Sequence, residues 1–578
     1  MSGTDRDQTT LDVRGLQTHF ESRQGAFRAV DDVSISIQPG KTLCVVGESG
    51  SGKSVMARSI LQIVDKPGRI VAGEIILNKH RDTNGRIIHG PIELTRLNPK
   101  SQTLRNIRGR DIAMIFQEPM SSLSPVHRIG DQIGEVIRVH EKVSKGEARE
   151  RTVELLRKVE IPKPELAIDR YPFEYSGGMR QRAMIAMALA CDPFVLIADE
   201  PTTALDVTIQ AEILALIKSL QTSSDMAVLF ITHDMGVVAE IADEIAVMRH
   251  GKVVETGSVR DIFAGPKHPY TKRLLEAVHE LDRPSERRLK MRAAREIGQP
   301  ILVSNKVRKE FPIPSGLLGL KKEVLVAVDD AELELRSGEN LGIVGESGSG
   351  KTTLGRCLQR IYSVTSGEIL YRKADAETID LAPLNDGELK QAWRDIRMVF
   401  QDPFASLNPR MTVGQIIAEP LITGSLMRGP EISARVKELL DLVGLPETAA
   451  SRYPHAFSGG QRQRISIARA IAPKPRVVIA DEATSALDVS LRTQILDLLL
   501  DLQEKLELSF ILISHDISVI RYFCDRTAVM YRGRVVEIGD TEEVCSNPQH
   551  DYTRALLSAV PIPDPTQRGT RQRIRYGG

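Results

Sequence analysis

The chain has 578 residues, a length at which about four domains are expected. Its 77 basic and 76 acidic residues leave a formal net charge of +1, which argues against nucleic-acid binding as its main role. The five cysteines are scattered without a C-x-x-C pair, so we expect free buried thiols and no disulfide framework or zinc site. The polar start of the chain is unlike a signal peptide, and no apolar run reaches the roughly 18 residues that span a bilayer. We therefore expect a soluble, cytoplasmic protein, for which other chains supply any membrane spans.

One eight-residue stretch occurs twice and reads G-x-x-x-x-G-K-[ST] each time, the pattern of a phosphate-binding P-loop. Each copy follows an apolar run of strand length, Leu43–Val46 or Leu341–Val344. The glycines let backbone N–H groups point at phosphate oxygens, the lysine reaches the phosphates, and the next hydroxyl ligates Mg²⁺. The predicted phosphate sites are Gly47, Glu48, Ser49, Gly50, Ser51, Gly52, Lys53 and Ser54 in one copy, and Gly345, Glu346, Ser347, Gly348, Ser349, Gly350, Lys351, Thr352 and Thr353 in the other.

The two P-loops belong to two homologous halves. Lys53 and Lys351 lie 298 residues apart, whereas later landmarks such as Ser176 and Ser458 lie 282 apart. The first half therefore carries 16 extra residues between these positions, and turn signals place most of them in Lys79–Ile92. We expect a first nucleotide-binding domain over 1–281, a linker over 282–300, and a second nucleotide-binding domain over 301–578 with a basic, disordered tail over 566–578.

The order of predicted elements is the same in both halves. Val33–Ile37 and Ala331–Leu335 alternate apolar and polar residues, as half-exposed strands of an antiparallel sheet do. Helical periodicity follows the P-loop region, and strand–helix alternation then resumes, which predicts a parallel sheet with crossover helices. The predicted class is α/β, with an N-terminal antiparallel subdomain in each half and inserted helical subdomains over about 118–190 and 402–472.

Two buried strands, one in each half, end in a pair of carboxylates. The first carboxylate, Asp199 or Asp481, is placed to hold Mg²⁺ through water. The second, Glu200 or Glu482, can orient and deprotonate an attacking water. We therefore expect both glutamates to be catalytic.

Four further polar residues follow predicted strands. Gln117 and Gln401 can reach Mg²⁺ or the water when the following loop moves, and His233 and His515 are expected to contact the γ-phosphate and to act in catalysis. The predicted metal ligands are thus Ser54, Gln117 and Asp199 in one half, and Thr352, Gln401 and Asp481 in the other.

A second anion site is expected in each half, at the start of a helix. Its residues are Ser176, Gly177 and Gly178 in the first half, and Ser458, Gly459, Gly460 and Gln461 in the second. Because each half already has a P-loop, the phosphate for this site must come from elsewhere. The nucleotide of the other half is the economical source, which predicts an intramolecular pseudo-dimer.

Together these motifs resemble the nucleotide-binding domains of ABC transporters over nearly the whole chain. In that resemblance the P-loops are Walker A motifs, and Gln117 and Gln401 lie in Q-loops. It implies two P-loop (RecA-like) domains, ATP and Mg²⁺ as cofactors, and ATP hydrolysis coupled to transport. It also implies signatures at Ser176–Gln181 and Ser458–Gln463, D-loops at Ala204–Asp206 and Ala486–Asp488, and switch histidines at His233 and His515.

The first signature departs slightly from the family pattern. Tyr175 precedes Ser176, and Met179 stands where glutamine is commoner. Neither change removes a phosphate contact.

A narrower resemblance is to the oligopeptide, dipeptide and nickel importer ATPases. It rests on Ser122–Pro125 and Ser406–Pro409 after the Q-loops, and on His268–Thr271 and His550–Thr553 near the end of each half. It implies two integral membrane permease subunits and a solute-binding protein as partners, at the cytoplasmic face of the bacterial inner membrane. Some relatives carry a four-cysteine iron–sulfur site, which we do not expect here because Cys191 and Cys357 have no cysteine between them.

Three questions stay open at this point. The alternative class is a soluble tandem ATPase acting on ribosomes or DNA, which the modest linker and the lack of zinc spacing disfavour. The cargo is predicted to be peptides or related small solutes, with nickel or glutathione-like solutes as alternatives. Phe20, with Phe27 as a rival, and Phe311 either stack on adenine or belong to the core.

The segments after the Q-loops are the predicted docking sites for the membrane subunits. They are Glu118–Gly134 and Asp402–Gly414, which follow a nucleotide-sensing residue and lead into the helical regions.

Overall fold

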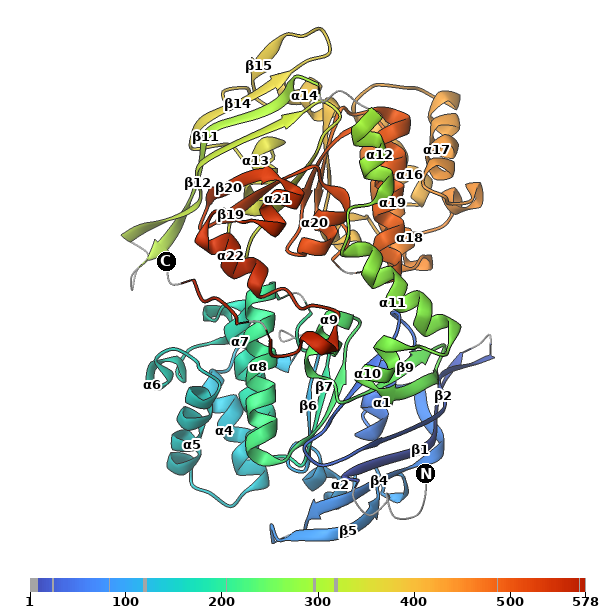
Figure 1. Ribbon diagram of the computed structural model, residues 1–578, viewed down its shortest axis with the longest axis vertical. Coiled ribbons are helices and arrows are strands. Elements are labelled where there is room, and N and C mark those ends of the chain that lie inside the picture. Colours follow the sequence, from blue (N-terminus) through green and yellow to red (C-terminus); the bar gives the residue numbers. More distant parts are fainter. Residues whose placement is uncertain are drawn as a thin grey trace. The chain divides into compact units, whose positions relative to one another are not determined.

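A computed structural model describes residues 9–22, 25–82, 84–117, 122–203, 205–294, 298–315, 321–485, 487–570 and 572–576. The chain forms two compact units, each containing one P-loop (Figure 1). Unit 1 comprises Met1–Leu205, Ile209–Glu276 and Pro561–Arg571, and unit 2 comprises Asp206–Thr208, Ala277–Val560 and Gln572–Gly578.

Each unit has an antiparallel sheet built from the alternating segments. In unit 1 its order is β2-β1-β4-β5, and in unit 2 it is β12-β11-β14-β15. Val33, Ile35 and Ile37 are buried on one face, as their spacing of two predicts. The strands are β1 (Leu11–Ser22), β2 (Gly25–Ile37), β4 (Gly68–Arg81) and β5 (Ile87–Glu93), and β11 (Pro300–Ser315), β12 (Lys321–Arg336), β14 (Ser366–Arg372) and β15 (Thr378–Asp380).

The extra residues of the first half lengthen one hairpin. Strands β4 and β5 have 14 and 7 residues, whereas β14 and β15 have 7 and 3. The predicted insertion, Lys79–Ile92, covers the tip of the longer hairpin. This hairpin lies at the end of the antiparallel sheet of unit 1 (Figure 1).

A six-stranded sheet forms the centre of each unit, in the order β10-β9-β3-β8-β7-β6 in unit 1 and β16-β17-β18-β13-β19-β20 in unit 2. All pairs are parallel except the edge pairs β9–β10 and β19–β20. The strands are β3 (Thr42–Val46), β6 (Ile112–Ile115), β7 (Val195–Asp199), β8 (Ala227–Ile231), β9 (Glu244–Arg249) and β10 (Lys252–Ser258), and β13 (Asn340–Val344), β16 (Ile396–Val399), β17 (Val477–Asp481), β18 (Ser509–Ile513), β19 (Arg526–Tyr531) and β20 (Arg534–Asp540).

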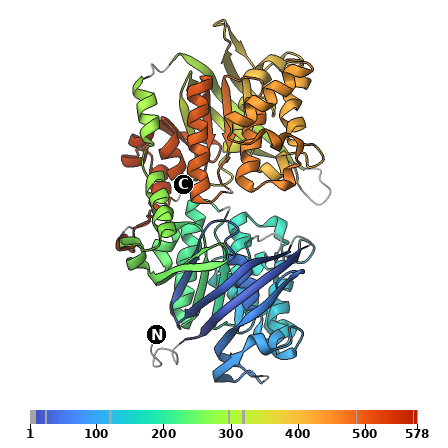
Figure 2. The ribbon, with the colours of Figure 1, turned by 90° about the vertical axis from the view of Figure 1, so that its right-hand side faces the viewer.

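Helices cover these sheets and form the inserted regions (Figure 2). The fold class predicted from the sequence, two α/β P-loop domains with antiparallel and helical parts, is confirmed. Helices of the first half are α1 (Lys53–Ile60), α2 (Gln102–Ile107), α4 (Ile129–His140), α5 (Lys145–Lys158), α6 (Pro164–Ala167), α7 (Gly177–Ala188), α8 (Val207–Ser224), α9 (Met235–Ile241), α10 (Val259–Ala264), α11 (Pro269–Leu281) and α12 (Glu286–Ala294). Those of the second are α13 (Lys351–Leu358), α14 (Leu389–Asp395), α15 (Pro403–Ser406), α16 (Val413–Thr423), α17 (Pro430–Leu442), α18 (Gly459–Ile471), α19 (Val489–Leu506), α20 (Ile517–Phe523), α21 (Thr541–Ser546) and α22 (Asp551–Ser558). Among the described residues no helix combines the length and the apolar character that a bilayer crossing requires.

A fully buried apolar layer joins the two sheets of each unit through the helix after the P-loop. Met56 and Ile60, one turn apart on α1, both have no exposed surface in unit 1. Leu354 and Leu358 repeat this arrangement on α13 in unit 2. Burying one such side chain contributes about 1.5–3 kcal/mol, so this layer holds the P-loop helix firmly against both sheets.

The segment after each half packs within the unit of the other half. Helix α12 follows the first half but belongs to unit 2, where Arg288 donates to the carbonyl of Cys524 just after α20. Residues 561–571 follow the second half but belong to unit 1, where Arg568 donates to the carbonyls of Ile241 and Ala242 at 3.2 and 3.0 Å. In Figure 1 this last, red segment runs beside α9.

The expectation of a disordered tail is therefore wrong for its described part. The last carbonyls of a helix lack partners within the helix, and a guanidinium with two N–H donors satisfies them well. The arginines of the tail show no helical or strand periodicity in the sequence. Arg568 binds the end of helix α9 and is not part of a regular helix or strand, so periodicity could not indicate its role.

Candidate nucleotide sites

The parallel strands bring the predicted site residues to one edge of each central sheet. In unit 1, β3 leads into the P-loop, β6 precedes Gln117, β7 ends at Asp199, and β8 precedes His233. Because the carboxyl ends of parallel strands meet at the same edge, residues far apart in the sequence become neighbours. Strands β13, β16, β17 and β18 do the same in unit 2.

Both P-loops are held in a conformation that requires glycine. Gly47 and Gly345 have φ of 153°, and a Cβ at either would lie 2.2 Å from the carbonyl oxygen of Met248 or Met530. A Cβ on Gly52 would likewise lie 2.2 Å from the carbonyl oxygen of Ala29. The loop can therefore take this shape only without side chains at these positions.

The P-loop lysines fold back onto their own loops. Lys53 Nζ donates to the carbonyl oxygens of Gly47 and Glu48 at 2.8 and 2.9 Å. Lys351 Nζ makes the matching bonds to Gly345 and Glu346, both at 2.7 Å. Burial lowers the pKa of Lys351, which shows that its charge needs these oxygens or an anionic replacement for them.

The hydroxyl after each lysine meets the first carboxylate of the facing strand. Ser54 donates to Asp199 Oδ1 at 2.9 Å, and Thr352 donates to Asp481 Oδ1 at 2.9 Å. Burial raises the pKa of both aspartates. Oδ2 of Asp481 is buried and accepts no hydrogen bond from any residue that the structure describes. A buried hydroxyl–carboxylate pair with an unused oxygen fits a hard divalent cation such as Mg²⁺.

The carboxylate of Glu200 contacts the side chains of three other residues. Its Oε2 accepts hydrogen bonds from Gln117 Nε2 and Thr203 Oγ1, both at 2.9 Å, and its Oε1 lies 3.3 Å from His233 Nδ1. Its backbone is left-handed, with φ of 48°, and its N–H donates to Ile231 at 3.0 Å. A non-glycine residue held in this region marks a site where geometry outweighs backbone preference.

Glu482 repeats this arrangement in unit 2. Its Oε2 accepts from Gln401 Nε2 at 2.7 Å, its Oε1 lies 3.3 Å from His515 Nδ1, and its φ is 47°. The predicted glutamine, glutamate and histidine of each half are thus brought together. Neither glutamine lies against an aspartate in these contacts; both meet the glutamate instead.

The hydrogen bonds keep both glutamates ionised. Burial alone would raise the pKa of Glu200, but the hydrogen bond from His233 and the nearby positive charge of that ring lower it to about 2. The pKa of Glu482 is lowered for the same reasons, with His515 as the partner. An ionised carboxylate accepts a hydrogen bond from water, so each glutamate is ready to orient a nucleophile.

The predicted second anion sites lie at the N-termini of α7 and α18. Ser176 is exposed and caps α7 by accepting from Met179 N at 3.3 Å, and Ser458 caps α18 by accepting from Gln461 N at 3.4 Å. A Cβ on Gly177 or Gly459 would meet nothing within 4 Å, so a ligand can approach this backbone closely.

The candidate adenine-stacking residues differ in exposure. Phe27 is 63% exposed, whereas Phe20 and Phe311 are half-buried at matching places on β1 and β11. Phe311 meets Tyr362 edge-to-face at 5.5 Å. Their role in adenine binding stays a prediction.

Sequence reasoning missed two residues that touch the P-loops. Tyr270 Oη accepts from Glu48 N at 3.0 Å, and Tyr552 Oη accepts from Glu346 N at 3.0 Å. Both lie in the matched His-Pro-Tyr-Thr and His-Asp-Tyr-Thr segments, which the sequence offered only as marks of resemblance.

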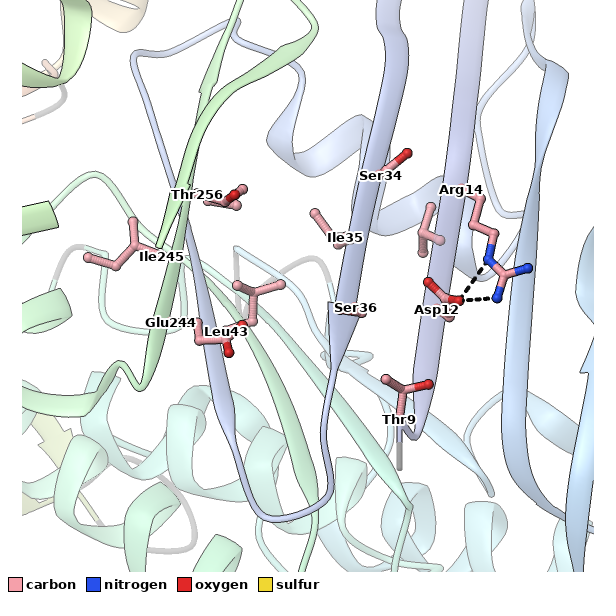
Figure 3. A pocket seen from close by; sticks show the side chains of 12 residues that line it. Thr9, Asp12, Arg14, Ser34, Ile35, Ser36, Leu43, Glu244, Ile245 and Thr256 are labelled. Carbon is pink, nitrogen blue, oxygen red and sulfur yellow. Dashed lines mark hydrogen bonds and ion pairs between the residues drawn. The ribbon is translucent and has the colours of Figure 1, made fainter. Parts of the chain in front are cut away.

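A separate cavity of about 320 Å³ lies away from these residues in unit 1. It opens between β1 and β2 on one side and β9 and β10 on the other, with the Asp12–Arg14 ion pair at one wall (Figure 3). Glu244 faces it from β9, and Arg526 stands at the matched position in unit 2. None of the predicted nucleotide-site residues lines it.

The two sheets, the P-loops and the clustered carboxylates define a tandem nucleoside triphosphatase of the P-loop class. Comparison with protein families gives the model "ABC transporter" at residues 30–203 and 328–485. The model "Oligopeptide/dipeptide transporter, C-terminal region" matches residues 254–300 and 536–576. This chain belongs to the ABC transporter family, and it hydrolyses ATP to drive transport.

Two similar relatives share the tandem arrangement. The glutathione import ATP-binding protein GsiA of Escherichia coli (strain K12) is 48% identical over 576 residues, covering 96% of this chain and 90% of GsiA. GsiA of Shigella boydii serotype 4 (strain Sb227) is 47% identical over 577 residues, with the same coverage. Among solved structures, the dimeric ATP-binding cassette MJ0796 in a post-hydrolysis state bound to ADP and Pi is 32% identical, covers 42% of this chain and 99% of its own, and has a TM-score of 0.37.

Proposed function

We propose that the chain is the ATP-hydrolysing subunit of a bacterial importer for peptides or glutathione-like solutes. Two observations support this proposal. Each half has a full set of contacts made by the P-loop lysine, the aspartate, the glutamine, the glutamate and the histidine. The chain also matches the oligopeptide/dipeptide C-terminal region. The printed function of its relative GsiA, glutathione import, supports a small peptide-like cargo. The chain would act peripherally, at the cytoplasmic face of the inner membrane.

In this proposal each half supplies one set of chemical roles. Lys53 and Lys351 leave their loop carbonyls to bind the β- and γ-phosphates, which replace those oxygens as partners of the buried charge. Glu200 and Glu482 orient the attacking water and accept its proton, while His233 and His515 move to the γ-phosphate. Gln117 and Gln401 bond the glutamates in this structure. When nucleotide binds, they would release the glutamates, and the segments that follow them would move as a result.

Mg²⁺ would be held by Ser54 and Asp199 in one site, and by Thr352 and Asp481 in the other. When bound, it neutralises phosphate charge in the transition state. Gln117 and Gln401 would complete these ligand sets after they release the glutamates.

We further propose that the two halves share each ATP head to tail within one chain. The exposed helix starts at Ser176 and Ser458 support this, because each would be an anion site that needs a phosphate in addition to the one at the P-loop of its own half. One site would pair Lys53 with Ser458, and the other would pair Lys351 with Ser176.

Two double mutants test the shared sites. Lys53→Ala with Ser458→Arg damages one site, so the residual ATPase activity should resemble that of the worse single mutant. Lys53→Ala with Ser176→Arg damages both sites and should lower activity much further. Equal activities, or the reverse order, would show that the halves are not arranged head to tail. ATP binding at each site is measured in parallel, so that cooperativity does not blur the contrast.

The permease subunits would dock on the segments after the Q-loops. Residues 118–121 of the first segment lie outside the described residues, residues 123–128 form a loop with an apolar tip, and residues 129–134 belong to α4. Gln132 accepts from Ser124 N at 2.8 Å and donates to His127 O at 2.9 Å, and Val126 between them is 73% exposed. In the second segment Phe404 is 62% exposed. Exposed apolar residues on a loop held by hydrogen bonds, such as Val126, or on the short helix α15, such as Phe404, suit a protein contact.

The decisive experiment is purification of the tagged chain from its native membranes. We expect two integral membrane subunits to copurify, and reconstituted ATPase activity to rise when a solute-binding protein delivers glutathione or a short peptide. Copurification of ribosomes or DNA without membrane subunits would overturn the proposal. A charge introduced at either exposed apolar residue, as Val126→Asp or Phe404→Asp, should uncouple transport while basal ATPase activity persists.

A further inference from the structure

The C-terminal region of each half reaches the P-loop of the same half through one tyrosine. Tyr270 is 3% exposed and Tyr552 is 1% exposed, so both hydroxyls act inside the protein. Each accepts the backbone N–H of the second P-loop residue, Glu48 or Glu346, at 3.0 Å. The same contact in two halves, across 222 residues in one and 206 in the other, indicates a built feature of the site.

The tyrosines are themselves fixed by matched hydrogen bonds. The N–H of Tyr270 donates to His268 Nδ1 at 3.1 Å, and Glu255 on β10 accepts from the N–H groups of Lys267 and His268 at 2.7 and 3.0 Å. In unit 2, Tyr552 N donates to His550 Nδ1 at 3.1 Å, and Glu537 accepts from Gln549 and His550 at 2.8 and 3.0 Å. Each ring is thus aimed at the P-loop by a carboxylate on the edge strand.

The backbone of Glu48 is bonded at both of its polar groups. Its N–H bonds Tyr270, and its carbonyl oxygen accepts from Lys53 Nζ. Lys53 has three N–H donors and directs two of them at the loop carbonyls of Gly47 and Glu48, so it gives up loop contacts as it turns donors toward a nucleotide phosphate. The tyrosine bond uses the N–H of Glu48 rather than its carbonyl, so it can persist when the lysine moves.

We propose that Tyr270 and Tyr552 are positioning residues for ATP binding. Each holds the first turn of its P-loop in the phosphate-binding shape while the lysine turns its donors from the loop carbonyls toward the phosphates. The ligand in question is the triphosphate of ATP, and neither tyrosine touches it. This inference rests on the nucleotide sites and is independent of the cargo and of the membrane subunits, so it can fail without affecting the import proposal.

The test measures ATP affinity at one site at a time. Lys351→Ala disables the second site, and Tyr270→Phe is then added to that chain. Loss of one neutral hydrogen bond should raise the dissociation constant for a fluorescent ATP analogue at the first site about 2- to 10-fold. The KM for ATP should rise with it while kcat changes little, as expected when ground-state and transition-state binding are lost together.

Thr152→Val in the same Lys351→Ala chain is the matched control. Thr152 has no exposed surface and donates to Ala148 O at 2.7 Å, so the variant loses a buried hydrogen bond far from the P-loop in sequence and contact. Its ATP affinity should not change, although its melting temperature can fall. Tyr552→Phe in a Lys53→Ala chain, with Tyr371→Phe as control, repeats the comparison in unit 2.

An unchanged dissociation constant in Tyr270→Phe, or an equal rise in Thr152→Val, would overturn the inference. Amide hydrogen exchange of the unmodified chain provides a test that needs no variant. The N–H groups of Glu48 and Glu346 should stay protected with ATP bound. Fast exchange at both under that condition would show that the tyrosines release the loops, which also contradicts the proposal.

Discussion

In unit 1 the hydroxyl of Thr203 donates to the carboxylate of Glu200 at 2.9 Å, whereas in unit 2 the hydroxyl of Ser485 donates to the carbonyl oxygen of Glu482 at 3.0 Å. The other bonds of the two glutamates match within 0.2 Å, from 2.9 Å at Gln117 to 2.7 Å at Gln401. The two clusters thus keep the same glutamine, glutamate and histidine contacts and differ in the neighbouring turn. This is the pattern expected if the carboxylate and its partners act in hydrolysis and the turn does not.

A second difference lies behind the P-loop tyrosines. The guanidinium of Arg249 lies 5.0 Å from the ring centre of Tyr270, while at the matched position Tyr531 packs on Tyr552 with ring centres 4.3 Å apart. Tyr576 from the chain end also lies 5.6 Å from Tyr552. A cation–π contact therefore packs against Tyr270, and an aromatic cluster packs against Tyr552. Both contacts restrict the movement of a buried tyrosine ring.

The largest expected effect tests whether the two glutamates are equivalent. Glu200→Gln and Glu482→Gln should each slow turnover about 10²–10⁴-fold at the altered site, because the amide cannot accept the proton of water. The double mutant should bind ATP at both sites and keep its two halves in the closed, ATP-bound state. Single-turnover rates at each site provide the measurement. If one variant keeps the wild-type rate at its own site, that glutamate is not the base and the two sites are unequal.

A smaller effect should appear in acid, on the stability of unit 1. The pKa of Glu200 lies below its ordinary value, so its contribution to stability is complete above about pH 4.5 and is lost as the pH falls toward 2. The melting temperature of wild type should therefore exceed that of Glu200→Gln at pH 7 by more than it does at pH 3.5. Thr203→Val removes one donor and should reduce the pH 7 difference. A gap between the two proteins that widens in acid would contradict this sign.

The smallest expected effect concerns the first turns of α7 and α18. Gln461 completes a capping box by accepting from Ser458 N at 3.1 Å, and Met179 at the matched position cannot accept in this way. Met179→Gln should raise the free energy of unfolding of unit 1 by about 0.5–1 kcal/mol, and Gln461→Met should lower that of unit 2 similarly. Denaturant titration resolves the two transitions if they separate. Changes of the same sign in both swaps would rule out the capping explanation.

The sequence predicted which polar residues lie together in each half because they belong to short local patterns. A glycine-rich loop after an apolar strand can be recognised from the sequence without knowledge of the fold. The same is true of an Asp-Glu pair at the end of an apolar strand. Parallel-sheet topology then requires these strand ends to meet. The α/β class and the clustering of Asp199, Glu200 and His233 follow from those two facts.

Contacts without a local pattern could not be predicted. Nothing near Glu48 indicates that its N–H meets a hydroxyl 222 residues later, since the partner is fixed by how α11 packs beside the P-loop. The left-handed backbone of Glu200 is likewise imposed by surrounding contacts, because glutamate has no preference for φ of 48°. Arg568 is a single residue that binds two carbonyls, and a lone arginine in a tail gives no periodic signal.

The segment that follows each half packs in the unit formed by the other half, and this affects whether the protein could be made as two separate chains. A split just after α12 would give a first product without Pro561–Arg571, which unit 1 contains, and a second product without α12, which unit 2 contains. Neither product alone would satisfy the last carbonyls of α9 or α20 with Arg568 or Arg288. The two products would need to be synthesised together and in equal amounts to fold completely, and translation of one fused message provides that stoichiometry without further regulation.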